Sequence, residues 1–380
     1  MKRKNIVFVL RNFEAGGVQE LLIQLLGKID LNVFTPFIVC TKDIGPLYVR
    51  LPGSCKNIYV LGTDKFYNPI ALLKLIKFLL KNKIDIIHSH QFVPDILSRI
   101  AGKITNTKLI ISSYHNVYPW KSSNKLNNRI KRFFDSITAN YFTNEIIAVS
   151  NAVREYHIKY LKINENKIKV VNNFINDAIY ISHTPKEVDD LKSQLGIPKD
   201  SQIILNVASL TKQKNHQLLL KVAKRILVNF PRTIFCIAGE GELHDDLVLM
   251  SEKLDIKKNI KFLGRRDDIY LLLQISDIFV LSSLWEGMPV TIIEAMAMRT
   301  PVVSTNVGGV SDAITHNVNG FLASSESVES LYENILNLLN NYNLRVKIRD
   351  EGYRTYKEKF SSDKILSRLY DIYSMNNVTK

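Results

Sequence analysis

Two glutamates flank the predicted start of a helix in the second half of the chain. The apolar run 278–281 predicts a buried strand, and the loop after it carries Glu286. A helix is predicted to begin near Val290, because Pro289 suits a first turn whose N–H groups lack partners within the helix, and Glu294 lies one turn further on. The N–H groups and the dipole of a helix start favour an anion. The segment therefore predicts an anion cradle between two carboxylates, which suits a diphosphate between two hydroxyl-rich groups, as in a nucleotide sugar.

The loop before this helix favours a binding role over the simpler alternative. A glutamate near a helix start is common, because a negative charge there is stabilising by itself. However, Trp285, Gly287 and Pro289 predict a stiff, tight loop directly after a strand. In open α/β sheets, ligands bind at that end of the strands.

Length and composition indicate a globular protein of two domains. A chain of 380 residues exceeds one typical core. Its 46% hydrophobic and 23% charged residues are ordinary for a folded protein. The three cysteines are odd in number and lack metal-ligand spacing, which indicates a reduced, cytoplasmic setting without disulfides. No apolar run approaches the roughly 20 residues of a membrane helix.

The positive charge of the chain lies almost entirely in its first half. Residues 1–180 contain 26 Lys and Arg against 12 Asp and Glu, a net +14, whereas residues 181–380 contain 25 against 24, a net +1. A one-sided basic field predicts an anionic partner. Nucleic acid is disfavoured because no basic–aromatic platform or recognition motif is present. An anionic membrane surface is the partner that we favour.

The stretch 121–142 is the most basic part of the chain and predicts an amphipathic helix. Lys125, Arg129 and Arg132 fall on one helical face. The apolar residues that accompany them are Leu126, Ile130, Phe133, Phe134 and Ile137. Such a helix can lie on an anionic bilayer. A solvated face over an ordinary core helix fits the same pattern.

Alternating strand and helix patterns predict a doubly wound parallel sheet in the first half. His90 and His115 each follow a predicted strand, 84–88 and 108–112, so both are expected at the ligand-binding edge. A lone histidine there is more often a hydrogen-bonded loop residue, but two on the same edge favour a site. Gly16-Gly17 separates the first strand from the first helix and either admits a ligand or makes a tight turn. This loop lacks the glycine pattern of a dinucleotide site, so NAD is not supported.

The second half repeats the theme after a polar segment, 172–200, that is the best candidate for a domain boundary. Each predicted strand there ends in a loop that contains Gly, Lys, Arg or Glu. Lys214 lies in such a loop, directly before a helix predicted from His216, where a lysine suits phosphate oxygens.

Several runs together resemble one enzyme family. They are FCIAGEGELHDDL, NIKFLGRRDD, WEGMPVTIIEAMAMRTPVVSTNVGGVSDAI and NGFL, with EAGGVQ, DIIHSHQ, SSYHN and IIAVSNAV earlier. The chain resembles the GT-B glycosyltransferases, and within them family 4 (glycosyltransferase group 1), the retaining enzymes related to bacterial capsule and lipopolysaccharide transferases. The resemblance implies an α/β fold of two Rossmann-like doubly wound domains facing a cleft. Residues 1–178 would bind the acceptor, 179–361 the nucleotide sugar, and 362–380 would form a helix packing back on the first domain.

The resemblance also implies roles for individual residues. Glu294 is expected to hold the ribose, Lys214 the diphosphate and His115 the reacting centre. Gly264 and Arg265 are expected beside the base, and Glu286 beside the donor sugar. The implied donor-binding residues are Gly16, Gly17, Ser209, Lys214, Gly264, Arg265, Glu286, Gly287, Met288, Pro289, Val290 and Glu294, and the implied catalytic residues are His115, Glu286 and Lys214.

Two departures from the family pattern affect the expected chemistry. Ser209 stands where the family usually has an arginine, so one basic clamp on the leaving diphosphate is missing, and Lys212 or the helix dipole is expected to compensate. No Asp-x-Asp motif follows a strand, which predicts a metal-independent reaction without a cofactor. Basic residues and helix starts can stabilise the departing nucleotide diphosphate instead.

The sequence therefore predicts a retaining glycosyltransferase for bacterial surface polysaccharides. It would move a hexose or N-acetylhexosamine from a nucleotide sugar, for which we favour a UDP-sugar, to a glycan or lipid-linked glycan acceptor. The expected location is cytoplasmic, peripherally attached to the inner face of the cell membrane. A nucleotide-sugar epimerase of similar fold and a nonenzymatic partner in a glycan-assembly complex stay open as alternatives.

Overall fold

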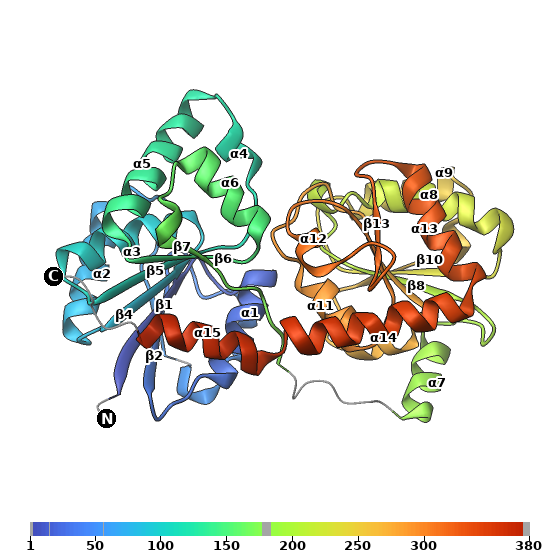
Figure 1. Cartoon of the computed structure of the whole chain (residues 1–380), viewed down its shortest axis with the longest axis horizontal. Helices are drawn as coiled ribbons and strands as arrows, with labels where there is room; N and C mark the ends of the chain where they lie inside the picture. Colours follow the sequence, from blue (N-terminus) through green and yellow to red (C-terminus); the bar gives the residue numbers. More distant parts are fainter. Residues whose placement is uncertain (1–2, 15, 56, 177–183, 375–380) are drawn as a thin grey trace. The chain divides into compact units, whose positions relative to one another are not determined.

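The computed structural model describes residues 3–14, 16–55, 57–176 and 184–374, which form two compact units (Figure 1). The first unit contains the described residues up to Asn176 together with those from Ser362 onwards. The second contains those from 184 to Ser361. The boundary predicted between 178 and 179 falls outside the described residues.

The first unit is built on a parallel sheet whose described strands run in the order β3-β2-β1-β4-β5-β6-β7. They are β1 (Lys4–Leu10), β2 (Phe34–Cys40), β3 (Ile58–Val60), β4 (Ile86–His90), β5 (Leu109–Tyr114), β6 (Glu145–Ala148) and β7 (Ile168–Val170). The chain proceeds outward from β1 to β3 and then returns to place β4 on the other side of β1. The carboxyl ends of β1 and β4 are therefore a topological switch point, where such sheets bind ligands.

Helices cover both faces of this sheet. They are α1 (Gly17–Lys28), α2 (Pro69–Lys81), α3 (Phe92–Ile104), α4 (Pro119–Ser122), α5 (Leu126–Phe142), α6 (Asn151–Leu161) and α15 (Ser362–Ser374). Alternate residues of β1 enter different cores: Phe8 packs with residues of α1 and α15, and Val7 with residues of α2 and α3. Both faces of β1 are thus buried, as its continuous apolar run predicts.

The second unit repeats this winding, with described strands in the order β10-β9-β8-β11-β12-β13. The strands are β8 (Ile203–Val207), β9 (Ile234–Ala238), β10 (Ile260–Gly264), β11 (Ile278–Leu281), β12 (Val302–Thr305) and β13 (Phe321–Ala323). The helices are α7 (Pro185–Gln194), α8 (His216–Asn229), α9 (His244–Lys253), α10 (Ile269–Ile275), α11 (Val290–Ala297), α12 (Val310–Ala313), α13 (Val328–Asn340) and α14 (Tyr342–Lys359). Its switch point lies at the carboxyl ends of β8 and β11.

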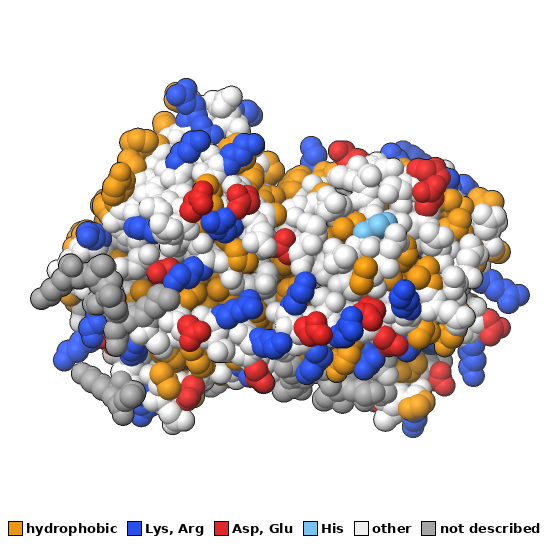
Figure 2. Space-filling view, in the orientation of Figure 1, with side chains coloured by type: hydrophobic (Ala, Val, Ile, Leu, Met, Phe, Trp, Pro, Cys, Tyr) orange, Lys and Arg blue, Asp and Glu red, His pale blue; other side chains and the backbone are white. Residues whose placement is uncertain are grey.

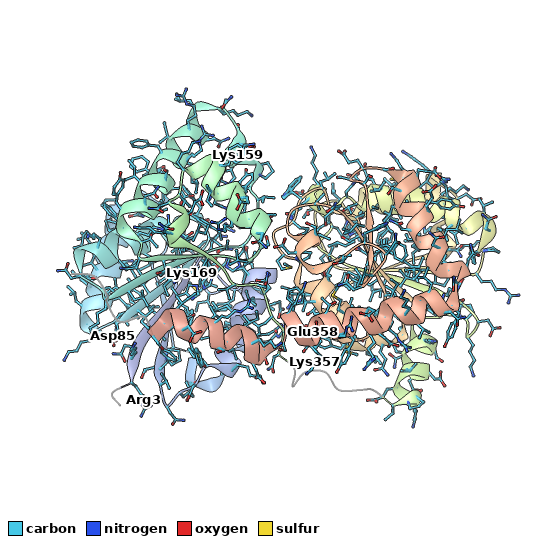
Figure 3. The ribbon with its side chains drawn as sticks, in the orientation of Figure 1. Arg3, Asp85, Lys159, Lys169, Lys357 and Glu358 are labelled. Carbon is cyan, nitrogen blue, oxygen red and sulfur yellow. The ribbon has the colours of Figure 1, made fainter. Side chains whose placement is uncertain are left out.

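An aspartate joins the two central strands at the opposite edge of each sheet. Asp85, labelled in Figure 3, precedes β4, and its Oδ2 accepts a hydrogen bond from the N–H of Asn5 at 2.9 Å. Asp277 precedes β11, and its Oδ2 accepts one from the N–H of Ile203 at 2.9 Å. These bonds hold together the amino ends of β1 and β4, and likewise those of β8 and β11. In each sheet these are the two strands whose carboxyl ends form the switch point.

Two segments differ from the sequence-based prediction. The strand predicted over 84–88 runs instead from Ile86 to His90, so His90 is the last residue of β4 and does not follow it. The segment 172–200, predicted only as a polar domain boundary, contains the helix α7. The capping box between Thr184 and Glu187 stabilises the start of α7.

Three observations bear on the expectations for the whole chain. Cys40, Cys55 and Cys236 are buried and free. None of the described helices combines the length and apolar character needed to cross a bilayer. The part of the chain that the structure describes holds no cluster of three or more His, Cys, Asp or Glu suited to a metal ion, and metal independence stays a prediction.

A buried charge network fixes the end of β5 and corrects the prediction for Lys121. This lysine belongs to α4 and not to the helix predicted over 121–142, which in the structure begins only at Leu126 as α5. Its Nζ lies 2.7 Å from Oδ2 of the buried Asp135 on α5. Oδ1 of Asp135 is 2.8 Å from Nη1 of the buried Arg99 on α3 and accepts a hydrogen bond from the hydroxyl of Tyr114. Burial by itself raises the pKa of Asp135, but Lys121 and Arg99 together hold it below its ordinary value. The network therefore ties α3, α4 and α5 to Tyr114, the last residue of β5.

Replacing Asp135 by Asn tests this network. The change leaves Arg99 and Lys121 buried without their shared counter-charge, so we expect the free energy of unfolding in a denaturant titration to fall by about 3–5 kcal/mol. Glu329→Gln is the matched control, because Glu329 pairs with Arg225 at the surface and exposed pairs contribute little. Equal stability of the two variants would show that the network does not support the fold.

Candidate active site

The loops that follow β8 and β11 are bonded to each other at the switch point of the second unit. The N–H of Leu284 donates to the carbonyl of Gln213 at 2.8 Å, and the Gln213 side chain donates to the carbonyl of Trp285 at 2.8 Å. The hydroxyl of Ser282 donates to the carbonyl of Lys214 at 2.9 Å. These bonds make one framework from segments about 70 residues apart.

Lys214 and Glu286 form an ion pair within this framework. Lys214 Nζ donates to Glu286 Oε1 at 2.5 Å, and the hydroxyl of Ser283 donates to the same oxygen at 2.6 Å. Glu286 is only 4% exposed, and its Oε2 makes no hydrogen bond with any described residue. Since an ammonium group has three N–H donors, Lys214 retains donors for a ligand while it neutralises Glu286.

A third loop, after β12, packs directly on the backbone of Glu286. Gly308 has φ +54, and a Cβ atom built there would lie 1.8 Å from the carbonyl oxygen of Glu286. The hydroxyl of Thr305, at the end of β12, donates to the carbonyl of Ser283 at 2.6 Å. Only glycine fits at this approach, and the contact limits how far the Glu286 loop can move.

The start of α11 and the side chain of Glu294 complete the predicted cradle. The helix begins at Val290, as the sequence predicts, and its N-cap Pro289 provides no side-chain cap, with no acidic residue in the first turn. An uncapped helix start favours an anion. Glu294 is half-buried on the same helix, and its Oε1 accepts a hydrogen bond from the hydroxyl of Tyr270 on α10 at 3.4 Å.

The remaining predicted residues of the second unit lie at the same edge of the sheet. Gly264 ends β10 with φ +64, and its carbonyl accepts a hydrogen bond from the N–H of Gly239 after β9 at 2.8 Å. Arg265 follows it and is exposed, as is Ser209 after β8. Gly287, Met288 and Pro289 are buried beside Glu286 in the loop before α11.

The residues predicted in the first unit lie at its own switch point. Gly17 is the first residue of α1, and a Cβ there would meet nothing within 4 Å. At Gly16 a Cβ would lie 2.7 Å from Oε1 of Gln19, a buried side chain whose amide donates to the carbonyl of Asn12, so alanine there would displace it. Their neighbour Ala15 lies outside the described residues. His115 directly follows β5 and is half-buried.

The second unit thus brings Lys214, Glu286 and the start of α11 to one switch point, and the first brings the glycine pair and His115 to another. Sequence reasoning missed Ser283, Gln213 and Tyr270, which hold these groups in place. A serine three residues before a loop glutamate is a weak signal for the Ser283 bond. Tyr270 and Gln213 form hydrogen bonds with residues that are distant in the sequence, and nothing in the linear sequence marks them.

Two doubly wound units with polar loops at their switch points have the architecture of the GT-B glycosyltransferases, and solved structures of this class match the chain over nearly its whole length. Anabaena Alr3699/HepE in complex with UDP is similar with a TM-score of 0.85 and 20% identity, covering 97% of this chain and 99% of that one. WaaG, a glycosyltransferase involved in lipopolysaccharide biosynthesis, is similar with a TM-score of 0.78 and 15% identity, covering 98% and 100%.

The sequence matches the same class. Residues 187–355 match the model of glycosyl transferases group 1, and residues 15–179 match that of glycosyltransferase family 4. The UDP-Gal:alpha-D-GlcNAc-diphosphoundecaprenol alpha-1,3-galactosyltransferase of Escherichia coli is 30% identical over 364 residues, covering 92% of this chain and 89% of that protein. The N-acetyl-alpha-D-glucosaminyl L-malate synthase of Bacillus anthracis is 24% identical, covering 81% and 79%. The chain belongs to this glycosyltransferase family, which confirms the resemblance drawn from its motifs.

Gly308→Ala tests the packing of the third loop on Glu286. Because the new methyl group would overlap the Glu286 carbonyl, we expect a lower melting temperature and a displaced Glu286 loop, measured by thermal unfolding and by a crystal structure. Gly27→Ala is the control: Gly27 lies within α1, where a Cβ meets nothing within 4 Å, and alanine there is expected to be neutral or stabilising. An unchanged melting temperature in Gly308→Ala would contradict the tight approach.

Proposed function

We propose that this protein is a retaining glycosyltransferase that moves a hexose or N-acetylhexosamine from a UDP-sugar to a glycan or lipid-linked glycan acceptor. The observation that carries the proposal is the Lys214–Glu286 pair, which lies in the loops at the switch point of the second sheet. A cation with unused donors and an uncapped helix start, both offered by one unit, suit a diphosphate. The second unit then binds the donor, and the first unit binds the acceptor.

The strand order supports an extended position for the nucleotide along the edge of the second sheet. Neighbouring strands lie about 4.8 Å apart, so β10 is roughly 10 Å from β8. With the diphosphate at Lys214, a base two strands away lies beside Gly264 and Arg265. Glu294 then accepts hydrogen bonds from the ribose hydroxyls. Its contact with Tyr270, on the helix that follows β10, supports this direction.

Stabilisation of the leaving group is the main chemical role in this proposal. Negative charge develops on the diphosphate as the bond to the sugar breaks, and preorganised donors aimed at that charge lower the barrier. Lys214 and the first turn of α11 supply such donors. The exposed Ser209 adds no charge, so Lys212 takes the place of the arginine usual in the family. No metal ion or cofactor takes part.

Glu286 holds the donor sugar in this proposal. Its Oε1 is occupied by Lys214 and Ser283, whereas Oε2 accepts a hydrogen bond from a sugar hydroxyl. The bond to Lys214 couples recognition of the sugar to recognition of the diphosphate. At the switch point of the first unit, Gly16 and Gly17 serve the donor phosphates and His115 the reacting centre in this proposal.

The relatives support the choice of donor and acceptor. The Escherichia coli relative is described as using UDP-Gal and a diphosphoundecaprenol-linked sugar. Alr3699/HepE was solved with UDP. A lipid-linked acceptor places the reaction of this protein at the inner face of the cell membrane, in the synthesis of a surface polysaccharide such as a capsule or lipopolysaccharide.

One face of α5 supports attachment to an anionic membrane. Leu126 and Phe133 are 69% and 59% exposed, so they are not the core contacts of an ordinary helix. The full α5 face consists of the exposed residues Leu126, Ile130, Phe133, Phe134 and Tyr141. Figure 2 shows hydrophobic side chains along the edge of the first unit where Figure 1 places α5. The exposed Arg129 and Lys131 lie among these residues and supply positive charge for anionic headgroups.

Two corrections refine the basic face that the sequence predicts. Lys125 is the N-cap residue of α5 and precedes its first turn. Arg132 donates to the carbonyl of Lys121 at 2.8 Å and is half-buried. The charge available to a membrane therefore comes from Lys125, Arg129 and Lys131.

Lys214→Ala and Glu294→Ala test the donor site. Each variant is expected to lose most of its sugar transfer, about 100-fold or more, because the first removes stabilisation of developing charge and the second a partner for the ribose. Transfer from a panel of nucleotide sugars to a lipid-linked acceptor is the measurement, with circular dichroism as the check on folding. Lys224→Ala, an exposed position on α8, is the control. Wild-type transfer in both site variants would refute the assignment.

The same assay separates transfer from the alternative of epimerisation. A retaining transferase leaves the sugar on the acceptor with the anomeric configuration of the donor, which NMR of the product reports. Release of free epimerised sugar from the donor alone would instead establish the epimerase.

Leu126→Ser combined with Phe133→Ser tests the α5 face. Loss of two exposed apolar side chains is expected to reduce co-sedimentation with vesicles of anionic phospholipid at low salt, without a loss of stability. Leu249→Ser is the control, because Leu249 is an exposed leucine of α9 in the second unit. Co-sedimentation equal to that of the unmodified protein would remove the α5 face as the membrane contact.

A further inference from the structure

Two histidines at the carboxyl edge of the first sheet are bonded ring to ring. His90 ends β4, His115 follows the neighbouring strand β5, and Nδ1 of His90 lies 2.9 Å from Nε2 of His115. His90 is 3% exposed. The inner ring is therefore fixed within the sheet, and the half-buried His115 is held by it.

Burial favours the neutral form of both imidazoles at physiological pH. Burial lowers the pKa of His115 to about 4, and burial together with the nearby His88 and His115 lowers the pKa of His90 well below its ordinary value. A neutral imidazole has one N–H and one bare nitrogen. The bond between the two rings therefore contains one hydrogen. If His90 donates it, the N–H of His115 is at Nδ1; if His115 donates it, the N–H of His115 is at Nε2.

The surroundings of His90 favour His90 as the donor. Its Nε2 is buried and has no hydrogen-bond partner among the described residues. The ring centroid of His88 lies 4.4 Å from that of His90, but both nitrogens of His88 are already bonded, to the hydroxyls of Tyr373 and Ser113 at 2.7 Å. His90 also lines a cavity of about 30 Å³, whose walls combine apolar side chains of Leu, Ile, Val and Phe with the polar ones of His88, Ser113, His115, Asn172 and Asn173. A buried N–H without an acceptor is rarer than a bare acceptor, so the hydrogen of His90 belongs on Nδ1.

The residue that follows His90 is held in an unusual backbone conformation. Gln91 has φ 80 and ψ 157, a region that is sparsely populated by residues other than glycine. The side chain of Gln91 accepts a hydrogen bond from the N–H of Arg11 at 3.0 Å, and its carbonyl accepts one from the N–H of Asp95 at 2.9 Å. These bonds hold the strained junction between β4 and α3, directly after His90.

We propose that His90 is a positioning residue that holds His115 as the tautomer with its hydrogen on Nδ1, so that His115 offers an N–H donor to the substrate. The proposal rests on the proposed function, which places His115 at the reacting centre. A histidine with its outer nitrogen already protonated binds an oxygen of the substrate and does not take a proton from the acceptor hydroxyl. His115 therefore acts as a hydrogen-bond donor and not as a general base.

The direct test is the tautomeric state of the full-length protein, measured by two-bond ¹H–¹⁵N correlation NMR with ¹⁵N-labelled histidine. The His115 signals are identified as those absent from His115→Gln. We expect both His90 and His115 to show the pattern of a neutral ring protonated at Nδ1. A His115 ring protonated at Nε2, or one charged at pH 7, would overturn the proposal whatever the activity of the protein.

A matched pair of variants tests the consequence for catalysis. In His90→Asn the amide nitrogen can occupy the place of Nδ1 and donate to His115, whereas in His90→Gln the amide reaches the place of Nε2. We expect His90→Asn to retain most of kcat and His90→Gln to lose about 10- to 100-fold in kcat, with the KM for the donor unchanged in both. Equal kcat values in the two variants would contradict the positioning role.

The outcomes separate this proposal from the proposed function. If His115→Ala transfers sugar at the wild-type rate, the assignment of His115 to the reacting centre fails, while the NMR result still reports on His90. If His115→Ala is inactive but both His90 variants are fully active, the reacting centre stands and the positioning role fails.

Discussion

The salt bridge between Lys214 and Glu286 is the contact on which the candidate donor site depends. A carboxylate as buried as Glu286 requires a partner, because an unpaired charge in such a place is strongly destabilising. The pairing therefore draws the loop after β8 onto the loop after β11, and Ser283, Gln213 and Gly308 fix the resulting geometry. A diphosphate that binds here meets a lysine side chain that Glu286 already orients. Little conformational entropy of that side chain is therefore lost on binding.

The two units use one topological solution for different chemical groups. Each sheet winds outward from its first strand and then returns to the other side of that strand, so one pair of central strands ends beside the start of a helix. In the second unit these ends carry a cation, a carboxylate and an uncapped helix start. In the first unit, β1 leads to the Gly16-Gly17 turn and β4 ends in His90, while the neighbouring β5 leads to His115. Buried contacts hold the polar groups in both cases, through the Asp135 network near β5 and through the backbone of Gly308 near β11.

Local signals in the sequence were sufficient for most of the fold. Continuous apolar runs mark the buried parallel strands, and Pro289 before an apolar helix predicts the start of α11 at Val290. The capping box at Thr184 and Glu187 is also a local signal, although it was not used to predict α7. Contacts between distant segments were beyond this reasoning. Lys214 and Glu286 are 72 residues apart, and their direct bond was not predicted. Lys121 was predicted only as the start of the basic helix 121–142, because a single sequence does not show that Asp135 of α5 faces it in the core.

A structure of the protein bound to a UDP-sugar is the most direct test of the donor site. We expect oxygens of the diphosphate within hydrogen-bond distance of Lys214 Nζ and of the first N–H groups of α11, with Glu286 still bonded to Ser283 and its second oxygen on the sugar. A nucleotide bound away from both groups, with Lys214 still engaged only by Glu286, would contradict this site.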